Sequence, residues 1–211
     1  MDRHQWDVRY GGEELVWTSA PNQFLVSEVA GLPAGRAVDL ACGEGRNAVW
    51  LAEQGWQVTG VDFSAVGLAK ARRLAALRKV EVTWVDSAVA DWMPPPEGFD
   101  LVVVFYLQLP QPVRSAALKV AASALAPRGN LLVVAHDRDN LTGGFGGPPS
   151  VDVLYRVTDV TEVAEAAGLR VQRAEQVIRV VPSDSGPKEA IDTLVRAVRP
   201  ESTKSISSEH R

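Results

Sequence analysis

The chain has 211 residues, of which 46% are hydrophobic and 23% charged, so length and composition indicate one folded domain and exclude global disorder. Its 22 Lys and Arg residues against 26 Asp and Glu residues give a net charge of −4, which counts against a general binder of nucleic-acid backbones. The single cysteine, Cys42, excludes an intrachain disulfide and a cysteine-based zinc site, and we expect no metal ion.

The sequence shows no targeting or membrane-spanning pattern. The first residues, Met1 to Gln5, lack a basic region followed by an apolar one, so we predict no signal peptide. No run of 18 apolar residues exists, and the longest tight run, Leu101 to Leu107, suits a buried strand. We therefore expect a cytoplasmic protein without a membrane partner.

Short apolar runs alternate with helical segments along the chain. In chain order, we predict a strand at 36–41, a helix from 47, a strand at 57–61, a helix from its N-cap Ser64 to 77, strands at 80–85 and 99–105, a helix at 113–125, a strand at 131–135, a helix capped by Thr158 and ending at Gly168, and strands at 169–181 and 192–198. Near-continuous apolar strands are typical of parallel sheets that are covered on both faces. Right-handed connections then predict an α/β, doubly wound sheet.

The two ends of the chain differ from this alternating pattern. Residues 1–30 form an extra segment that carries Trp6, Tyr10, Trp17 and Phe24, and we predict that this segment is a lid or cap that tightens on ligand binding. Residues 200–211 have little apolar content and are predicted to be a disordered tail. The remaining chain shows no linker, so we predict a single domain over residues 1–199.

A glycine-containing loop directly follows the first predicted strand. Gly43 and Gly45 permit positive φ angles and allow a ligand to approach the backbone. Ligands of open α/β sheets bind beyond the carboxyl ends of the strands, so this loop predicts a binding site. The spacing Gly43-x-Gly45-x-x-Ala48 also fits a dinucleotide fingerprint, which keeps an NAD-dependent oxidoreductase as an alternative.

Two aspartates near this loop bear on the choice of cofactor. Asp62 ends the second predicted strand, where it can accept hydrogen bonds from ribose hydroxyls or can be a helix-start aspartate favoured by the helix dipole. Asp39 precedes the glycines, where its carboxylate would repel the pyrophosphate of a nicotinamide dinucleotide. A ligand with a sulfonium and an ammonium group tolerates Asp39, and the pattern favours such a ligand.

The loop and the strands around it resemble a known enzyme family. Asp39-x-Ala41-x-Gly43-x-Gly45 resembles motif I of class I methyltransferases, which use S-adenosylmethionine. Asp62 matches the acidic residue at the end of the family's second strand, residues 99–103 match its fourth strand, and residues 125–131 match its turn into the fifth. Within this family, residues 42–52 are most similar to the small branch of tellurite-resistance and thiopurine or thiol methyltransferases.

The resemblance, which covers residues 36–198, implies a doubly wound, Rossmann-like seven-stranded sheet, mostly parallel with an antiparallel last strand and with helices on both faces. It implies S-adenosyl-L-methionine as cofactor and S-adenosyl-L-homocysteine as product. The implied cofactor residues are Trp17, Asp39, Ala41, Cys42, Gly43, Gly45, Arg46, Asn47, Asp62, Phe63, Ser87, Ala88, Val89 and Phe105. The sequence departs from the family at Ala88, where the Asp that holds the adenine amino group is usual, and at Ala41, where many members have Gly. Either Asp86, two positions earlier, takes the role of the missing Asp by a local shift, or only backbone groups contact the adenine.

The acceptor is expected beyond the fourth and fifth strands, where Tyr106 and His136 stand as candidate catalytic residues. His136 can remove a proton from an acceptor or can only hydrogen-bond the following loop, and Tyr106 can orient the acceptor. The loop at 143–149 is glycine-rich and can be a lid or an ordinary surface loop. Because methyl transfer from a sulfonium needs positioning more than acid–base chemistry, the lack of an obvious catalytic dyad does not argue against an enzyme.

The sequence therefore predicts an S-adenosylmethionine-dependent methyltransferase that acts on a small molecule, with a sulfur-, selenium- or tellurium-bearing or apolar acceptor as the favoured class. We expect no nucleic-acid partner and a monomer or homodimer. The alternatives are a methyltransferase-like protein that binds S-adenosylmethionine without catalysis and the NAD-dependent oxidoreductase. The acceptor itself is not indicated by any motif.

Overall fold

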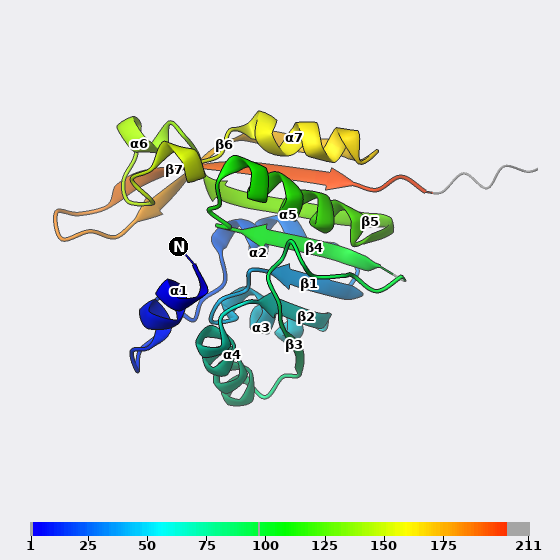
Figure 1. Ribbon diagram of the computed structural model, residues 1–211, viewed down its shortest axis with the longest axis horizontal. Helices are drawn as coiled ribbons and strands as arrows, with labels where there is room; N and C mark the ends of the chain where they lie inside the picture. The colour runs from blue at the N-terminus through cyan, green and yellow to red at the C-terminus, as the bar shows by residue number, and fades with distance from the viewer. Residues whose placement is uncertain (1, 97, 202–211) are drawn as a thin grey trace, which may run out of the picture.

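Seven strands form one twisted sheet in the order β3-β2-β1-β4-β5-β7-β6 (Figure 1). The structure, a computed structural model, describes residues 2–96 and 98–201. Its elements are α1 (Arg3–Tyr10), α2 (Gln23–Val29), β1 (Arg36–Leu40), α3 (Arg46–Glu53), β2 (Gln57–Asp62), α4 (Ala65–Arg78), β3 (Val82–Asp86), β4 (Phe99–Phe105), α5 (Gln111–Ser123), β5 (Leu125–His136), α6 (Asn140–Gly143), a 3₁₀ turn (Val151–Val153), α7 (Val157–Ala166), β6 (Arg170–Val181) and β7 (Lys188–Val198).

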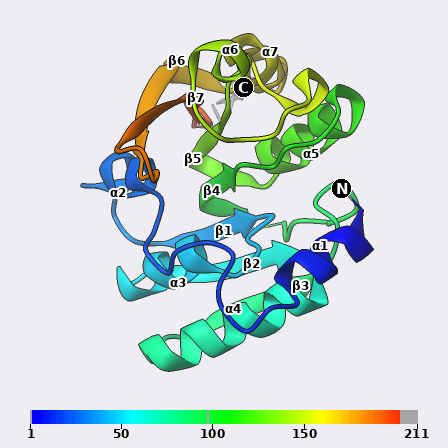
Figure 2. The same ribbon diagram turned by 90° about the vertical axis from the view of Figure 1, so that its left-hand side faces the viewer.

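The strand directions confirm the expected mixed sheet. Strands β3, β2, β1, β4 and β5 are parallel to their neighbours, whereas β7 is antiparallel to both β5 and β6. Helices α2, α3 and α4 cover one face and α5 and α7 the other, as the view along the strands shows (Figure 2). The predicted doubly wound, Rossmann-like architecture is therefore correct.

Most local predictions hold, and the differences have identifiable causes. Ser64 caps α4 as expected, because its hydroxyl accepts a hydrogen bond from the Gly67 amide (3.0 Å). The prediction that Thr158 caps α7 is wrong, since the N-cap is Arg156, two residues earlier, and the helix begins at Val157. The Asp159 carboxylate accepts from the Arg156 amide (2.9 Å) and so fixes the first turn upstream of Thr158.

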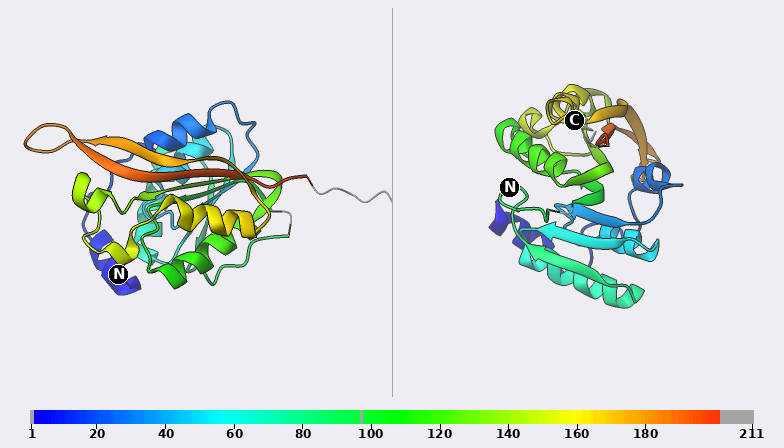
Figure 3. Two further views of the ribbon diagram at one scale, coloured as in Figure 1. Left: turned by 90° about the horizontal axis from the view of Figure 1, so that it is seen from above. Right: turned by 90° about the vertical axis from the view of Figure 1, so that its right-hand side faces the viewer.

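The last two strands extend beyond the rest of the sheet. β5 pairs with β7 only as far as the pair His136–Asp192, whereas β6 and β7 remain paired to Val181 and Lys188. The end of this hairpin therefore projects past the sheet, as the view from above shows (Figure 3). The hairpin starts earlier in β7 than the predicted residue 192, and its projecting part carries Arg179 toward the ends of β4 and β5.

The N-terminal segment is folded against the sheet rather than lacking regular structure. Asp2 closes a capping box with Gln5 at the start of α1, and α1 packs beside α4. Asn22 caps α2, whose Leu25 and Val29 are buried against β4 and β5 side chains. The predicted tail from residue 202 onward lies outside the described residues. Within the described part of the chain, none of the helices has the length and apolar character that a membrane crossing requires.

We expect Arg114→Met in α5 to destabilise the fold. Arg114 is 1% exposed and donates to the Leu154 carbonyl (3.0 Å) and to the Asp159 carboxylate (2.9 Å). Its loss leaves the Leu154 carbonyl unpaired and leaves Asp159 with only the Arg156 amide as a partner. We expect the free energy of unfolding to fall by about 2–3 kcal/mol, less than for a fully buried pair because Asp159 is partly exposed. Urea denaturation measures the change, with Lys119→Met on the exposed side of α5 as matched control. Equal stability of the two variants would contradict the assigned role of Arg114.

Candidate functional site

The loop after β1 adopts a conformation that only small residues allow. Ala41, Gly43 and Gly45 have φ angles of 59°, 53° and 81°. A Cβ added at Gly45 would lie 2.7 Å from the Ala71 side chain, so α3 can begin this close to α4 only with glycine. Ala41 takes a left-handed conformation that glycine adopts without strain, which explains why glycine is usual at this point in the family the sequence resembles.

Two buried aspartates fix the loop from the ends of neighbouring strands. Asp39 is 1% exposed, and its carboxylate accepts a hydrogen bond from the Ala48 amide (3.1 Å) at the start of α3. Burial raises the pKa of Asp39 to about 7. Asp62 accepts from the amides of Gly43 and Ser64, each at 2.8 Å, and burial also raises its pKa. The negative charge of Asp62 raises the pKa of Asp39 further.

A buried ion pair that the sequence did not reveal ties the N-terminal segment to this loop. The Glu44 carboxylate is 3.0 Å from the Lys70 ammonium and accepts hydrogen bonds from the amides of Val16 (3.0 Å) and Trp17 (3.1 Å). Lys70 also donates to the Glu14 carbonyl. No short motif signals this arrangement, because its members come from three separate segments of the chain.

Helix α1 covers the end of β2 and the loop after β1. Tyr10 is 5% exposed and lies so close to the loop that a Cβ at Gly43 would be 2.7 Å from its hydroxyl. Ser64 donates a hydrogen bond to the Asp7 carboxylate, and Arg3 forms an ion pair with Asp86 (3.1 Å). Residues 2–10 therefore cover the region in which the expected cofactor residues lie.

The remaining expected cofactor residues lie partly in this region and partly in the core. The Arg3 guanidinium is 5.9 Å from the Phe63 ring centre, and Val89 is buried. The Ser87 hydroxyl donates to the Ala88 carbonyl (3.0 Å). Trp17 is 42% exposed and contacts the loop through its backbone amide rather than by burying its ring.

Phe105 faces the packed interior, and Cys42 is half-buried. A Cβ at Gly60 would meet the Cys42 sulfur at 3.2 Å, and burial raises the pKa of the Cys42 thiol, so the side chain fits packing rather than nucleophilic chemistry. Phe105 is 7% exposed in the apolar core beneath α2 and α3. Direct cofactor contact by Phe105 therefore depends on its backbone.

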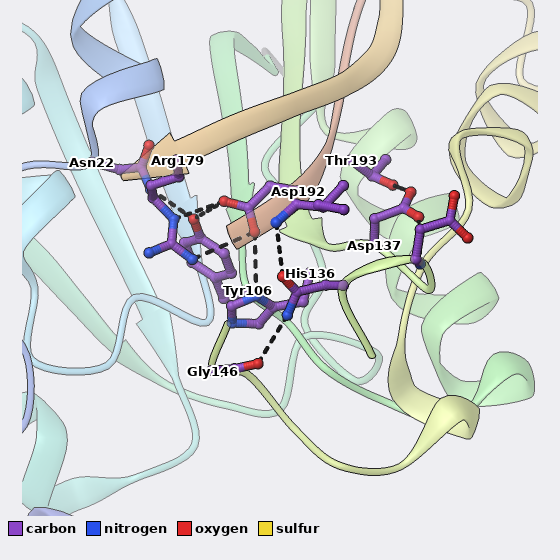
Figure 4. Close-up of polar contacts among 11 residues, drawn as sticks. Asn22, Tyr106, His136, Asp137, Gly146, Arg179, Asp192 and Thr193 are labelled. Carbon is purple, nitrogen blue, oxygen red and sulfur yellow. Dashed lines mark hydrogen bonds and ion pairs between the residues drawn. The ribbon is translucent and has the colours of Figure 1, made fainter. Parts of the chain in front are cut away.

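A polar cluster lies at the carboxyl ends of β4 and β5 (Figure 4). The Tyr106 hydroxyl donates to the Asp192 carboxylate (2.8 Å), and the Arg179 Nε donates to the same oxygen (2.7 Å). The His136 Nδ1 is 3.2 Å from the other Asp192 oxygen, and its ring centre is 4.9 Å from that of Tyr106. The cluster brings the two candidate catalytic residues together around one fully buried carboxylate.

The charges of this cluster are set by its buried carboxylate. Burial alone would raise the pKa of Asp192, but its interactions with His136 and Arg179 outweigh burial and hold the pKa below its usual value. Asp192 is therefore ionised at neutral pH. Tyr106 occupies a left-handed conformation (φ 54°), and burial raises the pKa of its hydroxyl, which stays protonated and donates.

Asn22 links this polar cluster to the loop after β1. The Asn22 amide side chain donates to the Tyr106 hydroxyl (3.3 Å), and its backbone amide donates to the side-chain oxygen of Asn47 in α3 (2.9 Å). The sequence did not indicate Asn22, Arg179 or Asp192 as site residues, because Asn22 lies in the N-terminal segment without a predicted element and the other two lie in predicted strands. Their role depends on the hairpin of β6 and β7 folding back over β4 and β5.

The glycine-rich loop lies against His136. The Asn140 side chain donates to the Gly146 carbonyl (2.8 Å) and accepts from the Ile191 amide (2.7 Å), which fixes the loop to β7. A Cβ at Gly147 would be 3.1 Å from the His136 ring. The loop therefore covers one side of the imidazole, as expected for a segment that borders the site.

Comparison with known proteins adds the decisive observation. Residues 37–129 match a family model described as "Methyltransferase domain". The chain is 30% identical over 194 residues to thiocyanate methyltransferase 1 of Arabidopsis thaliana, covering 85% of this chain and 82% of that protein. The chain belongs to the class I S-adenosylmethionine-dependent methyltransferases.

Solved structures agree with this membership at the level of the fold. A structure described by the conversion of a disulfide bond into a thioacetal group during echinomycin biosynthesis has a TM-score of 0.76 at 22% identity, covering 97% of this chain and 95% of that one. Magnesium protoporphyrin IX methyltransferase of Synechocystis PCC 6803, with bound S-adenosylhomocysteine, has a TM-score of 0.66 at 19% identity, covering 93% and 94% of the two chains.

Family membership confirms the expected enzyme class and its cofactor, S-adenosylmethionine. The oxidoreductase alternative has no support from these relatives. Asp39, whose carboxylate disfavours a pyrophosphate, is the residue on which sequence reasoning separated the two cofactors.

We expect Asp39→Asn to change how stability depends on pH. Between about pH 4 and pH 7 the unfolded chain ionises Asp39 while the folded protein keeps it protonated, because its pKa rises from 3.8 to about 7. Stability of the methyltransferase therefore falls as pH rises through this window. The asparagine variant does not lose this stability. Above pH 7 its free energy of unfolding should exceed that of the wild type by at most roughly 4 kcal/mol.

Urea denaturation at pH 5 and pH 8 measures this effect, with Asp91→Asn at an exposed position as control. The stability advantage of Asp39→Asn should be larger at pH 8 than at pH 5. A pH-independent difference would show that the Asp39 carboxyl is already ionised in the folded protein.

Proposed function

We propose that this methyltransferase transfers a methyl group from S-adenosylmethionine to a sulfur-, selenium- or tellurium-bearing small molecule, which binds beside Tyr106 and His136. The observation that carries the proposal is the cluster of these two side chains around Asp192, one strand away from the glycine loop after β1. In an open α/β sheet, this edge is the place where ligands of neighbouring strands meet.

The residues around the loop after β1 fit the cofactor. In this proposal, Asp62 accepts hydrogen bonds from the ribose hydroxyls of the cofactor. The ammonium group of the cofactor lies at the part of the loop that Asp39 fixes. Arg46 is half-buried with no hydrogen bond or ion pair within residues 2–96 and 98–201, and burial lowers its pKa. A half-buried guanidinium without a hydrogen bond or ion pair among these residues fits the carboxylate of the methionine portion. Bound there, S-adenosylmethionine supplies the electrophilic methyl group.

His136 is placed to accept a proton from the acceptor. Its Nδ1 faces the ionised Asp192 carboxylate at 3.2 Å, which orients the ring. The Nε2 atom is then the one available to the acceptor. Tyr106 is assigned to positioning, since its hydroxyl is held by Asp192 and Asn22.

The preference for a soft acceptor is supported by what the similar proteins are described as doing. Thiocyanate methyltransferase is named for a sulfur-bearing anion, and the echinomycin structure is described by a reaction at a disulfide. Methyl transfer to such an atom is a displacement that depends chiefly on alignment, so His136 is needed only where the acceptor carries a proton.

The N-terminal segment is assigned as the lid of the cofactor site. Residues 2–17 lie over the loop after β1 and are held by Glu44 and Lys70. Entry of the cofactor then requires α1 to move away from Asp62. We retain as proposals a single domain over residues 1–199, a monomer or homodimer, a cytoplasmic location and the absence of a nucleic-acid partner.

Calorimetric titration with S-adenosylhomocysteine tests the cofactor assignments. We expect 1:1 binding, no binding of NAD, and at least about tenfold weaker binding of Asp62→Asn, because each lost charge-assisted hydrogen bond contributes about 1.5–3 kcal/mol. Asp152→Asn at an exposed position is the matched control. Unchanged affinity of a folded Asp62→Asn variant would remove Asp62 from the cofactor site.

A panel of acceptors tests the reaction, with formation of S-adenosylhomocysteine as readout. We expect turnover of thiols and chalcogen anions, and a decrease in kcat of about 100-fold for His136→Asn with a protonated thiol acceptor, the usual size of a general-base contribution. The same variant should keep most activity toward thiocyanate, which has no proton to lose. Equal losses with both acceptors would assign His136 to positioning. Cofactor binding without turnover of any acceptor would favour the non-catalytic alternative.

A further inference from the structure

A groove of about 520 Å³ lies far from the proposed active site, where β7 ends and β5 and β6 begin. Because β4 and β5 carry the active site at their carboxyl ends, this groove is at the opposite edge of the sheet. Its polar lining consists mainly of arginines: Arg128, Arg170, Arg196 and Arg199, with Asn130, Gln172 and Glu201.

The charge of this groove opposes that of the whole chain. Four guanidinium groups and a single carboxylate, that of Glu201, line it, whereas the chain has a net charge of −4. Like charges gathered in one groove repel each other, so their assembly is favourable only when other interactions compensate. A concave cationic surface on an acidic protein therefore indicates an anionic ligand.

Most of these guanidinium groups retain unused hydrogen-bond donors. Arg170 is exposed and has no hydrogen bond or ion pair within the part of the chain that the structure describes. Among the described residues, the Arg128 guanidinium forms an ion pair with Glu201 at 3.4 Å, and both side chains are more than 70% exposed, so this pair contributes little. The Nε atoms of Arg196 and Arg199 are buried and lack a partner among the described residues.

One terminal nitrogen of each of these two arginines is occupied by the protein. Arg196 is 3.3 Å from the Glu28 carboxylate, which also pairs with Arg173, and Arg199 donates to the Ala122 carbonyl (2.7 Å). These contacts fix the two guanidinium groups in place. Arg128 and Arg170 are therefore the arginines whose charge is most available to a ligand.

Backbone conformation gives an independent indication at Arg128. Its φ angle is 67°, in the left-handed region that favours glycine, and a non-glycine residue there costs about 1 kcal/mol. The neighbouring residue, Gly129, is held close to the Phe99 carbonyl, where a Cβ would lie 2.5 Å away. The first part of β5 thus keeps an arginine at a position that glycine would occupy without strain.

We infer that this groove is a second binding site, for a small anion with two or more phosphate groups. Guanidinium groups match phosphate oxygens with paired hydrogen bonds, and several converging arginines favour a ligand with more than one negative charge. The volume suits a diphosphate or the phosphate arm of a nucleotide. The site lies at the opposite edge of the sheet from the loop after β1, so its ligand does not compete with S-adenosylmethionine.

Calorimetric titration of the full chain with inorganic pyrophosphate at low ionic strength tests this inference. We expect saturable 1:1 binding that Arg170→Gln and Arg128→Gly each weaken at least fivefold. Arg73→Gln on exposed α4 removes the same charge elsewhere and should leave the affinity unchanged. Arg128→Gly should also raise Tm, since it relieves the backbone strain, so weaker binding cannot be attributed to unfolding.

Three further measurements define the ligand. Tighter binding of ADP than of pyrophosphate would identify a nucleotide, and equal affinities would identify the phosphates alone. Saturation with S-adenosylhomocysteine should leave pyrophosphate affinity unchanged, and this separates the groove from the proposed active site. No saturable binding, equal weakening by Arg73→Gln, or tighter binding of a single-stranded oligonucleotide than of either phosphate ligand would overturn the inference.

Discussion

The site of this methyltransferase depends on the central position of β1, because the strand order reverses there and successive strands are added on opposite sides of β1. β2 and β3 follow on one side, and β4 and β5 on the other. The loops that leave β1 and β4 therefore diverge and leave room at the carboxyl edge of the sheet. The glycines at 43 and 45 allow the first of these loops to remain close to α4, so that the opening is lined by backbone.

Buried carboxylates hold the segments around this opening together. Asp39 and Asp62 fix the loop after β1, Glu44 fixes the N-terminal segment, and Asp192 joins the hairpin of β6 and β7 to Tyr106. A buried carboxylate is tolerated only when hydrogen bonds or cations compensate its desolvation. Each buried carboxylate is therefore stable only when its hydrogen-bond partners are in place. These contacts order the site before a ligand binds.

The proposed site also contains strained backbone and buried charges, which are locally unfavourable. Ala41 and Tyr106 adopt left-handed backbone conformations at the ends of β1 and β4, and Asp39 is buried with a raised pKa beside Asp62. Strained backbone and mutually repelling charges are stable only because the surrounding sheet is well packed. A cation placed between the aspartates would relieve their repulsion, which fits a cofactor that carries positive charge.

The sequence by itself determined the strands and helices of the doubly wound sheet and the cofactor class, but not helices α1 and α2. Alternating apolar runs predicted the doubly wound sheet, Ser64 marked the start of α4, and Asp39 with Gly43 indicated S-adenosylmethionine, because these signals are local and depend on neighbouring residues. Only the tertiary structure placed Asp192 beside Tyr106 and His136 and joined Glu44 to Lys70. Such contacts connect segments far apart in the chain, and they exist only after the hairpin and the N-terminal segment pack against the sheet. Arg156 replaced Thr158 as a helix cap for the same kind of reason, since the geometry of the Asp159 carboxylate decided the first turn.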